Sequence, residues 1–579
     1  MTVATHTGVA PRAGAGLLLD AVDRWAELSP TATAVTAPDG ALTFSELRLE
    51  VRAMAAALLA AGAGPGVTVG LGFGRSRSTV SALLAVWRAG ATAVPIDDRH
   101  PADRIAYIVA DARLQLLLGE LPATVPHPGV RAVDWSSAPA EDHHPAPAPD
   151  DPAYLVYTSG TTGRPKGVEV GYGNLGAFLA AISTLGLTPG GVGLNPLSPA
   201  FDGWFWCTLL YLLHGQGVAI VDVAGTGTAD LAGAIEAVAP RTTCMSPSMY
   251  AACPDDLPSV EVVVIAGEAS PPTLARRFAG RRVLNVYGPT EATIAATWSD
   301  SEAGDDVTTI GRAIPGYQVY VLNADGRQAG DGEDGELCVA GPGVALGYRN
   351  LPELTAAKFV PNPFGDGRLY RTGDRVRSRA DGQLEFLGRV DDQVKVRGFR
   401  VELGEIERTA TDADEVRAAA AFVLTNGDAL GLAIVPEPGV DPVAAVEAVT
   451  GRCQHLLPDY MMPVVVDAMT EIPVSQQGKA DRAVLATLVA AERQVTGVPP
   501  RTDRERLVCE VLSSVLPRPV YDVDANFFES GGHSLLASRA VVALRKATGL
   551  RLSIKDLLTH PTPAELAKKL DRVAAESGQ

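Results

Sequence analysis

Short runs of apolar residues alternate with longer amphipathic segments through most of the chain. Strands are expected at 67–73, 153–157, 217–223 and 262–265, and a helix rich in Ala and Leu is expected at 81–89. Short buried strands that alternate with helices are typical of α/β layers. From about residue 333, Gly-punctuated segments such as GELCVAGPG and GQLEFLGRV predict β-hairpins instead.

The C-terminal third of the chain predicts smaller units. A compact α+β segment is expected after residue 389, to about residue 481. The segment 494–503 (QVTGVPPRTD) predicts a linker, because its Pro pair opposes both helix and sheet. Residues from about 504 to 575 predict a separate, predominantly helical module. The Pro- and Ala-rich segment 136–151 is expected to be an exposed connector.

Composition narrows the class of protein. The 579 residues are 46% hydrophobic and 20% charged, which excludes a wholly disordered chain. The net charge of −18 would repel a phosphate backbone, so nucleic acid is not an expected partner. The six cysteines form no C-x-x-C pair, which argues against zinc and for a reducing compartment. With neither a bilayer-spanning apolar run nor a secretory signal, we expect a cytoplasmic protein without membrane contacts.

The segment 157–167 (YTSGTTGRPKG) directly follows a strand-like run. Its glycines let the backbone approach an anion, and successive N–H groups and hydroxyls can hold phosphate oxygens. It is not a Walker A loop, because Lys166 is followed by Gly167 and not by Ser or Thr. The alternative for this segment alone is a flexible Gly/Thr turn.

Three further segments place candidate side chains at turns. The segment 285–291 (NVYGPTE) brings Tyr287 and Glu291 together, an aromatic ring suited to a purine and a carboxylate suited to Mg²⁺. Asp374, in YRTGD, could accept two ribose hydroxyls, and Lys479, in QGK, could swing into a site. Ordinary solvated turns are the alternative for each segment taken alone.

In this order and at these spacings, the segments closely resemble the adenylate-forming superfamily, specifically the amino-acid adenylation domains of nonribosomal peptide synthetases. Supporting matches are LTFSEL (42–47), RAGATAVPID (88–97), GELCVAGPGVALGY (335–348), PELTAAKF (352–359) and ELGEIE (402–407). The resemblance covers about residues 16 to 482. It implies an α/β multidomain fold, with a large core of α/β layers plus a β-rich part, and a small α+β C-terminal subdomain.

The resemblance implies an ATP-dependent, AMP-forming ligase that works in two steps. An amino-acid carboxylate attacks the α-phosphate of Mg·ATP, and a carrier thiol then displaces AMP. The first step joins two anions, so oriented N–H donors and cations are what it needs. The family's phosphate-holding positions correspond here to Thr158, Ser159, Gly160, Thr161, Thr162, Gly163 and Lys166.

Other roles carry over residue by residue. By this resemblance Tyr287 stacks on adenine, Thr290 contacts the α-phosphate and Glu291 binds Mg²⁺. Asp374 binds the ribose, with Arg389 nearby. The family's mobile lysine corresponds to Lys479, which bridges the substrate carboxylate and the phosphate–ribose oxygens, and its hinge corresponds to Asp391. Rotation at the hinge would withdraw Lys479 and admit the carrier arm.

The segment 201–206 (FDGWFW) indicates the substrate class. Asp202 matches the family residue that pairs with the α-ammonium, and a buried Asp without a cation is costly, so an α-amino acid is favoured over a fatty or aryl acid. The other pocket positions are uncharged and offer no obvious hydrogen bond to a side chain: Gly203, Trp206, Met245, Val264, Ala266, Val286, Ile294 and Ala295. The pattern is similar to phenylalanine-type pockets, and bulky Met245 could shorten the cavity to suit Leu, Val or Ile. We expect an aromatic or bulky branched residue.

The segment 524–536 (DANFFESGGHSLL) lies in the last module. Phe527 and Phe528 would anchor it, and Ser534 would begin a helix that ends at Gly549. The apolar face of this helix comprises Leu536, Ala540, Val541 and Leu544. An ordinary N-cap is the alternative for Ser534. The segment looks like a peptidyl carrier domain, an all-α four-helix fold in which this serine carries 4′-phosphopantetheine.

Together these features predict an adenylation–carrier didomain. We expect a large subdomain at 16–390, a small subdomain at 391–487, a linker at 488–503 and a carrier domain at 504–575. Such a chain would be a free-standing loading enzyme of antibiotic or other natural-product biosynthesis. The implied partners are a phosphopantetheinyl transferase and a downstream condensation or tailoring enzyme, with a small MbtH-like activator as a further candidate. The alternatives are an acyl- or aryl-acid CoA ligase and a carrier scaffold with an inactive adenylation domain.

Overall fold

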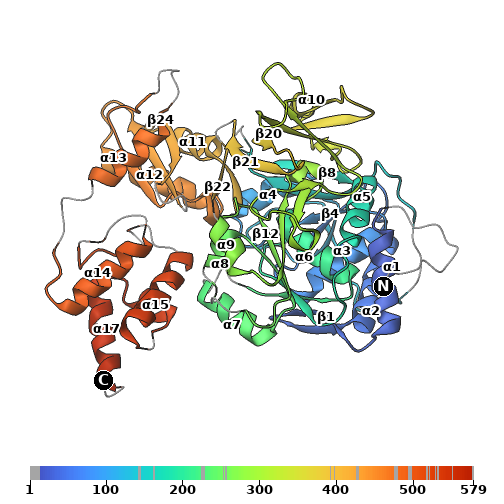
Figure 1. Ribbon diagram of the computed structural model, residues 1–579, viewed down its shortest axis with the longest axis horizontal. Helices are drawn as coiled ribbons and strands as arrows, with labels where there is room; N and C mark the ends of the chain where they lie inside the picture. The colour runs from blue at the N-terminus through green and yellow to red at the C-terminus, as the bar shows by residue number, and fades with distance from the viewer. Residues whose placement is uncertain are drawn as a thin grey trace.

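The structure is a computed structural model, and three parts follow one another along the chain (Figure 1). A large N-terminal part ends with the strand Leu384–Arg389, a small lobe follows from Gln393 to Glu492, and a helical module begins at Asp503. The described residues are 14–140, 145–160, 164–222, 228–251, 253, 257–390, 393–396, 398–424, 429–474, 480–492, 498–516, 520, 522–527, 530, 534–550 and 552–576.

A seven-stranded sheet of order β18-β8-β7-β4-β3-β5-β6 forms one layer of the large part. Strands β7, β4, β3, β5 and β6 run parallel, and β8 and β18 complete the sheet in antiparallel fashion. The strands are β3 (Thr68–Gly72), β4 (Thr92–Pro95), β5 (Leu116–Gly119), β6 (Arg131–Ala132), β7 (Pro152–Thr158), β8 (Lys166–Gly171) and β18 (Gly347–Tyr348). The central strands are buried on both faces, which explains their almost continuous apolar runs.

A nine-stranded sheet of order β15-β14-β13-β12-β11-β9-β10-β1-β2 forms a second layer. Its central strands, from β13 to β1 in this order, are parallel. The strands are β1 (Thr33–Ala37), β2 (Gly40–Thr43), β9 (Val192–Asn195), β10 (Gly217–Ile220), β11 (Thr242–Met245), β12 (Val262–Ala266), β13 (Arg282–Tyr287), β14 (Thr297–Asp300) and β15 (Arg312–Ala313). The strands expected at 67–73, 153–157, 217–223 and 262–265 are therefore confirmed.

Helices link and cover these sheets. They are α1 (Gly16–Leu28), α2 (Phe44–Ala60), α3 (Arg77–Arg88), α4 (Ala102–Asp111), α5 (Tyr172–Ser183), α6 (Asp202–Leu213), α7 (Thr228–Val238), α8 (Pro247–Ala251) and α9 (Pro272–Arg277). Helix α2 begins where the LTFSEL segment forms a capping box, in which Thr43 and Glu46 satisfy each other's backbone N–H groups. Helices α3 and α6 are buried on almost every side, because one apolar core joins both sheets through them.

The predicted hairpins form an antiparallel sheet of order β16-β17-β20-β19, with β21 paired to β20. Its elements are β16 (Gln318–Leu322), β17 (Asp334–Ala340), α10 (Pro352–Lys358), β19 (Phe359–Pro361), β20 (Arg368–Ser378) and β21 (Leu384–Arg389). This sheet lies at the top of the large part in Figure 1, and β21 is the last strand of that part.

The small lobe has the expected α+β character. A two-stranded hairpin, β22 (Gln393–Val396) and β23 (Phe399–Glu402), leads into α11 (Leu403–Thr411). A three-stranded sheet and two helices follow: β24 (Val416–Val423), β25 (Leu430–Pro436), α12 (Pro442–Leu456), β26 (Val465–Ala468) and α13 (Arg482–Glu492). These elements have an apolar core of their own.

The helical module comprises α14 (Asp503–Val515), α15 (Ser534–Thr548), α16 (Ile554–Thr559) and α17 (Pro563–Glu576), which confirms the four-helix prediction. Thr502 and Glu505 form a capping box that starts α14. Phe527 lies in the module's core, and Phe528 falls outside the described residues. The apolar face expected on α15 is fully buried, and Gly549, at φ 70°, ends that helix. Helix α15 lies beside α7 of the large part (Figure 1).

The expected boundaries at 390, 487 and 503 stay predictions. Within the described ranges, every helix is too short or too polar to cross a membrane.

Candidate active site

The candidate phosphate loop connects β7 to β8, and its two ends face each other, because Thr158 pairs with Lys166. A Cβ on Gly160 would lie 2.1 Å from the carbonyl oxygen of Arg164, so only glycine fits this close turn. The Thr158 hydroxyl is buried and has no hydrogen-bond partner among the described residues. Such an orphaned hydroxyl fits a site for phosphate oxygens. Thr161, Thr162 and Gly163 lie outside the described residues.

Glu291 is the fully buried centre of a charged cluster beside this loop. It lies in a single 3₁₀ turn, Thr290–Ala292, after β13. One carboxylate oxygen, Oε1, accepts a hydrogen bond from the Tyr348 hydroxyl at 2.7 Å and lies 3.6 Å from Lys166 Nζ. The other, Oε2, accepts one from Arg400 Nη1 at 2.8 Å. Two cations therefore hold Glu291 ionised without solvent.

The pKa values of this cluster follow its charges. Burial would raise the pKa of Glu291, but Arg400 and Lys166 overcome it and hold the pKa well below its usual range. Burial and the neighbouring Arg400 lower the pKa of Lys166. A buried carboxylate is a hard ligand of the kind that Mg²⁺ prefers, so Glu291 fits a metal, provided that Arg400 moves away.

The residues predicted to face the nucleotide also come together. Asp374, on β20, accepts hydrogen bonds from the Tyr287 hydroxyl and from Arg389 Nη1, the latter at 2.6 Å. Lys395 Nζ lies 5.4 Å from the ring centroid of Tyr287 and 5.7 Å from that of Phe386. Burial lowers the pKa of Lys395. The structure thus brings the predicted Tyr287, Asp374 and Arg389 into one group, with Lys395 against it.

Asp202 begins α6 and is half-buried, with its Oδ2 atom turned away from solvent. Its Oδ2 atom has no hydrogen-bond partner among the described residues. Burial raises the pKa of Asp202 to about 6, although a hydrogen bond from Thr290 works in the other direction. A buried carboxylate oxygen without a hydrogen-bond partner is costly, and a cation from outside the chain would stabilise it.

Apolar pocket residues surround the helix that carries Asp202. Trp206, one turn along α6, packs against Phe178 and Trp298. Its indole N–H is buried and has no hydrogen-bond partner among the described residues, so the pocket wall does hold one donor. Gly203, the second residue of α6, has no side chain to line a pocket. The other predicted positions, with one exception, share the same apolar core or pack against it: Val264, Ala266, Val286, Ile294 and Ala295.

Met245 is the exception, and its assignment to the pocket is corrected here. In the register of β11 and β12, Met245 lies opposite Ile265 and packs in a different core with Val263. Cys244 lies opposite Val264 instead, and contact with the Cys207 thiol of α6, together with burial, raises its pKa well above the usual value. Because successive side chains of a strand point to opposite faces, Cys244 is the β11 residue on the pocket side.

The small lobe closes against this site. Phe399 of β23 and Tyr460 stack with a centroid separation of 4.5 Å, and both rings contact Phe201, the residue before Asp202. Glu405 of α11 accepts hydrogen bonds from Gly160 N at 3.0 Å and from Arg104 Nη1 at 2.8 Å. The hairpin β22–β23 and the start of α11 therefore lie directly on the phosphate loop.

Several contacts of the site were not predicted from the sequence. Glu402 and Glu405 fall in the matching segment 402–407, and Lys395 and Arg400 lie just before it. The matching segments ELGEIE (402–407) and GELCVAGPGVALGY (335–348) were the signal that could have found Glu402, Glu405 and Tyr348. The predicted Lys479 and Asp391 lie outside the described residues, and Ser534 is the first residue of α15.

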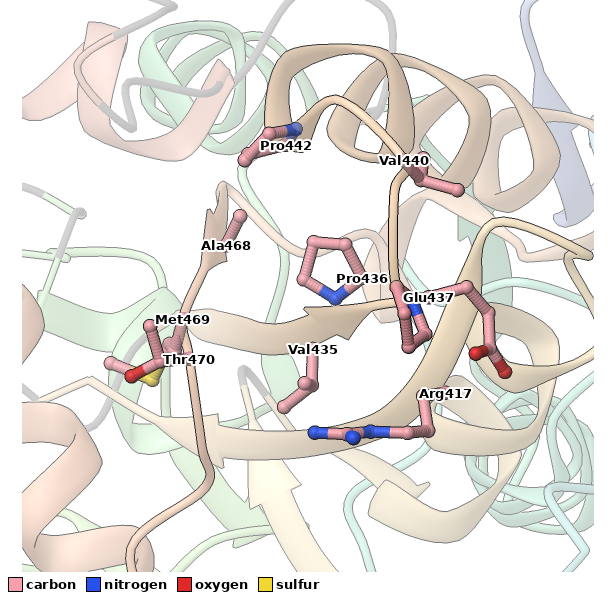
Figure 2. Close-up of a pocket in the computed structure, with 10 residues that line it drawn as sticks. Arg417, Val435, Pro436, Glu437, Val440, Pro442, Ala468, Met469 and Thr470 are labelled. Carbon is pink, nitrogen blue, oxygen red and sulfur yellow. The ribbon is translucent and has the colours of Figure 1, made fainter.

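A cavity of about 380 Å³ in the small lobe is separate from this cluster (Figure 2). Its lining comes entirely from β24, β25, β26 and the segments next to them, including Arg417 and Glu437. It contains none of the predicted site residues.

Comparison with known proteins decides the family. Residues 22–349 match the family model described as AMP-binding enzyme, and residues 506–570 match the one described as phosphopantetheine attachment site. The chain belongs to the AMP-binding enzyme family. Within this family it is an adenylation domain followed by a carrier domain, as the sequence analysis predicted.

Similar proteins include a biosynthesis protein and a peptide synthetase, both from Streptomyces. Novobiocin biosynthesis protein H of Streptomyces niveus is 39% identical, with 94% of each chain covered. Phosphinothricin tripeptide synthetase PhsC of Streptomyces viridochromogenes is 36% identical over 97% of this chain, which spans only 53% of that protein. The structure of holo-PA1221, an NRPS protein containing adenylation and PCP domains, superimposes with a TM-score of 0.78 at 26% identity and 96% coverage of both chains.

The adenylation–carrier chain is thus an ATP-dependent, AMP-forming ligase of the nonribosomal peptide synthetase type, which activates an acid and loads it on its carrier. Its cofactors are ATP with Mg²⁺, and 4′-phosphopantetheine. A carrier domain of this kind needs a phosphopantetheinyl transferase to become active.

Proposed function

We propose that the substrate is a hydrophobic α-amino acid, aromatic or bulky and branched. The observation that carries this proposal is the buried Oδ2 of Asp202, which has no hydrogen-bond partner among the described residues. An α-ammonium group would pair with it, whereas a fatty or aryl acid would leave the carboxylate unsatisfied. The walls formed by Val264, Ala266 and Val286 offer no compensation for a charged side chain.

In the first step, the phosphate loop and Lys166 hold the phosphates that leave. The orphaned Thr158 hydroxyl and the N–H of Gly160 supply donors, and Thr290, beside Glu291, donates a hydrogen bond to the Asp202 carboxylate. Donors fixed before the reaction stabilise the charge that builds up as two anions meet, without reorganisation at that moment. The same role falls by resemblance to Ser159, Thr161, Thr162 and Gly163.

Tyr287 supplies a face for adenine, and the Asp374–Arg389 pair lies where ribose hydroxyls would be recognised. Glu291 would hold Mg²⁺, which supplies charge neutralisation on the phosphates when it is bound. Lys479 approaches the reacting carboxylate in this step. Rotation about Asp391 then exchanges Lys479 for the carrier arm on Ser534.

The aminoacyl thioester would pass to a downstream condensation or tailoring enzyme. An acyl- or aryl-acid CoA ligase shares the nucleotide site, but neither the Asp202 Oδ2 atom without a partner among the described residues nor the carrier domain suits it.

ATP–pyrophosphate exchange with a panel of amino acids tests the proposal. We expect exchange with one or a few hydrophobic or aromatic amino acids, and its loss in Asp202→Asn, which keeps the side-chain shape but removes the charge. Exchange driven by a carboxylic acid that lacks an α-amino group, and retained in Asp202→Asn, would contradict it.

A further inference from the structure

The turn between Glu291 and β14 has an unusual backbone. Thr293 and Ile294 are consecutive non-glycine residues in the left-handed region, with φ of 57° and 74°. The N–H of Ala295 donates a hydrogen bond to the carbonyl oxygen of Thr293 at 2.9 Å, which closes a three-residue turn around Ile294. A γ-turn with this sign of φ at its centre is the rare and strained form. Both side chains are also β-branched, which makes a positive φ costly, so the chain stores strain at this turn.

The strained turn carries two positions of the predicted amino-acid pocket. Ile294 and Ala295 belong to the apolar core that also holds Trp206 and Val286. Glycine would adopt this turn without strain, but it would bring no side chain to the pocket. Strain of this kind persists only where the surrounding structure over-determines it, and it gathers at functional sites. The groups that hold the turn are therefore candidates for a role in substrate binding.

The Thr293 side chain ties the turn to a neighbouring segment. Its fully buried hydroxyl donates a hydrogen bond to the carbonyl oxygen of Gly343 at 2.7 Å. Gly343 lies in the segment 341–346, between β17 and β18. From the same segment, the N–H of Ala345 donates a hydrogen bond to the carbonyl oxygen of Glu291 at 2.9 Å. The segment therefore holds the turn at its start and at its strained part.

Asn174, the third residue of α5, fixes the segment from the other side. Its Nδ2 atom donates hydrogen bonds to the carbonyl oxygens of Pro342 and Val344, at 2.8 and 3.0 Å. These two residues flank Gly343. The Oδ1 atom of Asn174 accepts a hydrogen bond from Gly171 N at 2.8 Å, so the start of α5 orients the amide. A chain of hydrogen bonds thus runs from the helix through the segment to the strained turn.

We propose that Thr293 and Asn174 are positioning residues for the amino-acid pocket. Thr293 holds the strained turn, and Asn174 holds the backbone that the Thr293 hydroxyl binds. This inference rests on the proposed function of the pocket. When the bond of the Thr293 hydroxyl is lost, the turn relaxes towards ordinary negative φ, and Ile294 and Ala295 leave the places that fit the substrate side chain. Fixed walls are what an apolar pocket needs to choose between side chains that differ by one methylene group.

Steady-state ATP–pyrophosphate exchange by the full-length chain, with the preferred amino acid of the panel, tests this proposal. Thr293→Val keeps the branched shape but removes the donor, and Asn174→Asp keeps the acceptor for Gly171 N but removes both donors. Each should raise KM for the amino acid by about tenfold, as loss of one net hydrogen bond would, and change KM for ATP by less than about twofold. Thr293→Ser keeps the hydroxyl and should stay close to wild type in both constants. If Thr293→Val fails to fold, Asn174→Asp, at a half-buried position, carries the same comparison.

Thr68→Val is the matched control. The buried Thr68, on β3, donates a hydrogen bond from its hydroxyl to the carbonyl oxygen of Arg113 at 2.8 Å, and Arg113 is another non-glycine residue with a positive φ, at 50°. Strand β3 belongs to the seven-stranded sheet, whereas the strained turn leads into β14 of the nine-stranded sheet. Thr68→Val should therefore lower the melting temperature about as much as Thr293→Val but leave both KM values unchanged. An equal rise of the amino-acid KM in both variants would mean that lost stability alone weakens substrate binding, and it would overturn the proposal.

A double variant tests whether the two residues act in one chain. Thr293→Val combined with Asn174→Asp should raise the amino-acid KM no more than the larger single change, since both break the same support. Effects that multiply would overturn the role assigned to Asn174. Wild-type exchange, with an unchanged amino-acid KM in folded Thr293→Val and Asn174→Asp, would overturn this inference alone. A wild type without amino-acid-dependent exchange would overturn the proposed function instead.

Discussion

Cys244 and Val264 lie opposite each other on the parallel strands β11 and β12, and the Cys244 thiol contacts Cys207 on the helix that carries Asp202. Met245, the next residue, lies on the other face of the sheet. We therefore expect the size of residue 244 to affect substrate choice, whereas Met245 packs in a separate core.

A larger side chain at 244 should shift selectivity. We expect Cys244→Leu to lower kcat/KM for the largest accepted amino acid by about 10- to 200-fold relative to smaller ones, since one or two methylene groups decide fit in an apolar pocket. Met245→Leu conserves volume and should change selectivity little. Exchange rates across the amino-acid panel measure both effects, and an unchanged order of preference in Cys244→Leu would refute the corrected assignment.

Protonation of Asp202 should lower the rate of amino-acid activation at acid pH. Burial raises its pKa to about 6, so the carboxylate is ionised at neutral pH and becomes protonated as the pH falls below 6. The protonated form cannot pair with an ammonium, so kcat/KM for the amino acid should fall about tenfold per pH unit below that value. Asp202→Asn should lack this decline and be weak at every pH. An apparent pKa near the ordinary value of about 4 would argue against the buried environment.

The sequence and the structure agree best where a motif is local. The two ends of the loop 157–167 and the turn that carries Glu291 each depend on a few neighbouring residues, so their placement could be predicted. Asp374 was expected at a turn, but it lies inside the long strand β20, where it pairs with Arg389 of β21. Met245 shows the opposite case: a strand alternates with period two, and an error of one residue turns a side chain to the other face. A family resemblance therefore predicts the place of a segment more reliably than the role of a single residue within it.

Contacts between distant segments could not be predicted from the sequence. Arg400 and Glu291 are 109 residues apart, and Glu405 and Gly160 are 245 apart. Their meeting depends on how the small lobe seats on the large part, and no local pattern encodes that arrangement. The same limit applies to the pairing of Tyr287 with Asp374, which two different sheets bring together.

Lys479 should be needed for adenylate formation but not for transfer to the carrier. We expect Lys479→Ala to reduce adenylate formation by at least about 100-fold, because the step that joins two anions loses its mobile cation. Transfer from supplied aminoacyl adenylate to the carrier should continue close to the wild-type rate. Single-turnover assays of each step measure the split, and equal loss in both would contradict the assigned role.

Ser534 should be the only attachment point needed for loading. After treatment with a phosphopantetheinyl transferase and coenzyme A, intact-mass spectrometry should show one pantetheine adduct in the wild type and none in Ser534→Ala. Adenylate formation should be unaffected in this variant, since the nucleotide site lies in the other domain. An adduct that persists in Ser534→Ala would place the modification elsewhere.

Arg539 of α15 connects the carrier to the large part, where its Nη2 donates a hydrogen bond to the carbonyl oxygen of Ser248 at 3.4 Å. Ser248 lies on α8, and α15 also packs against α7. A net contribution of about 1 kcal/mol for such a bond predicts that Arg539→Glu slows self-loading by about 2- to 10-fold, with amino-acid-dependent exchange unchanged. Lys546→Glu is the matched control, because Lys546 is an exposed cation on the same helix. Equal slowing in both variants would mean that the overall charge of the carrier, and not the contact with Ser248, sets the loading rate.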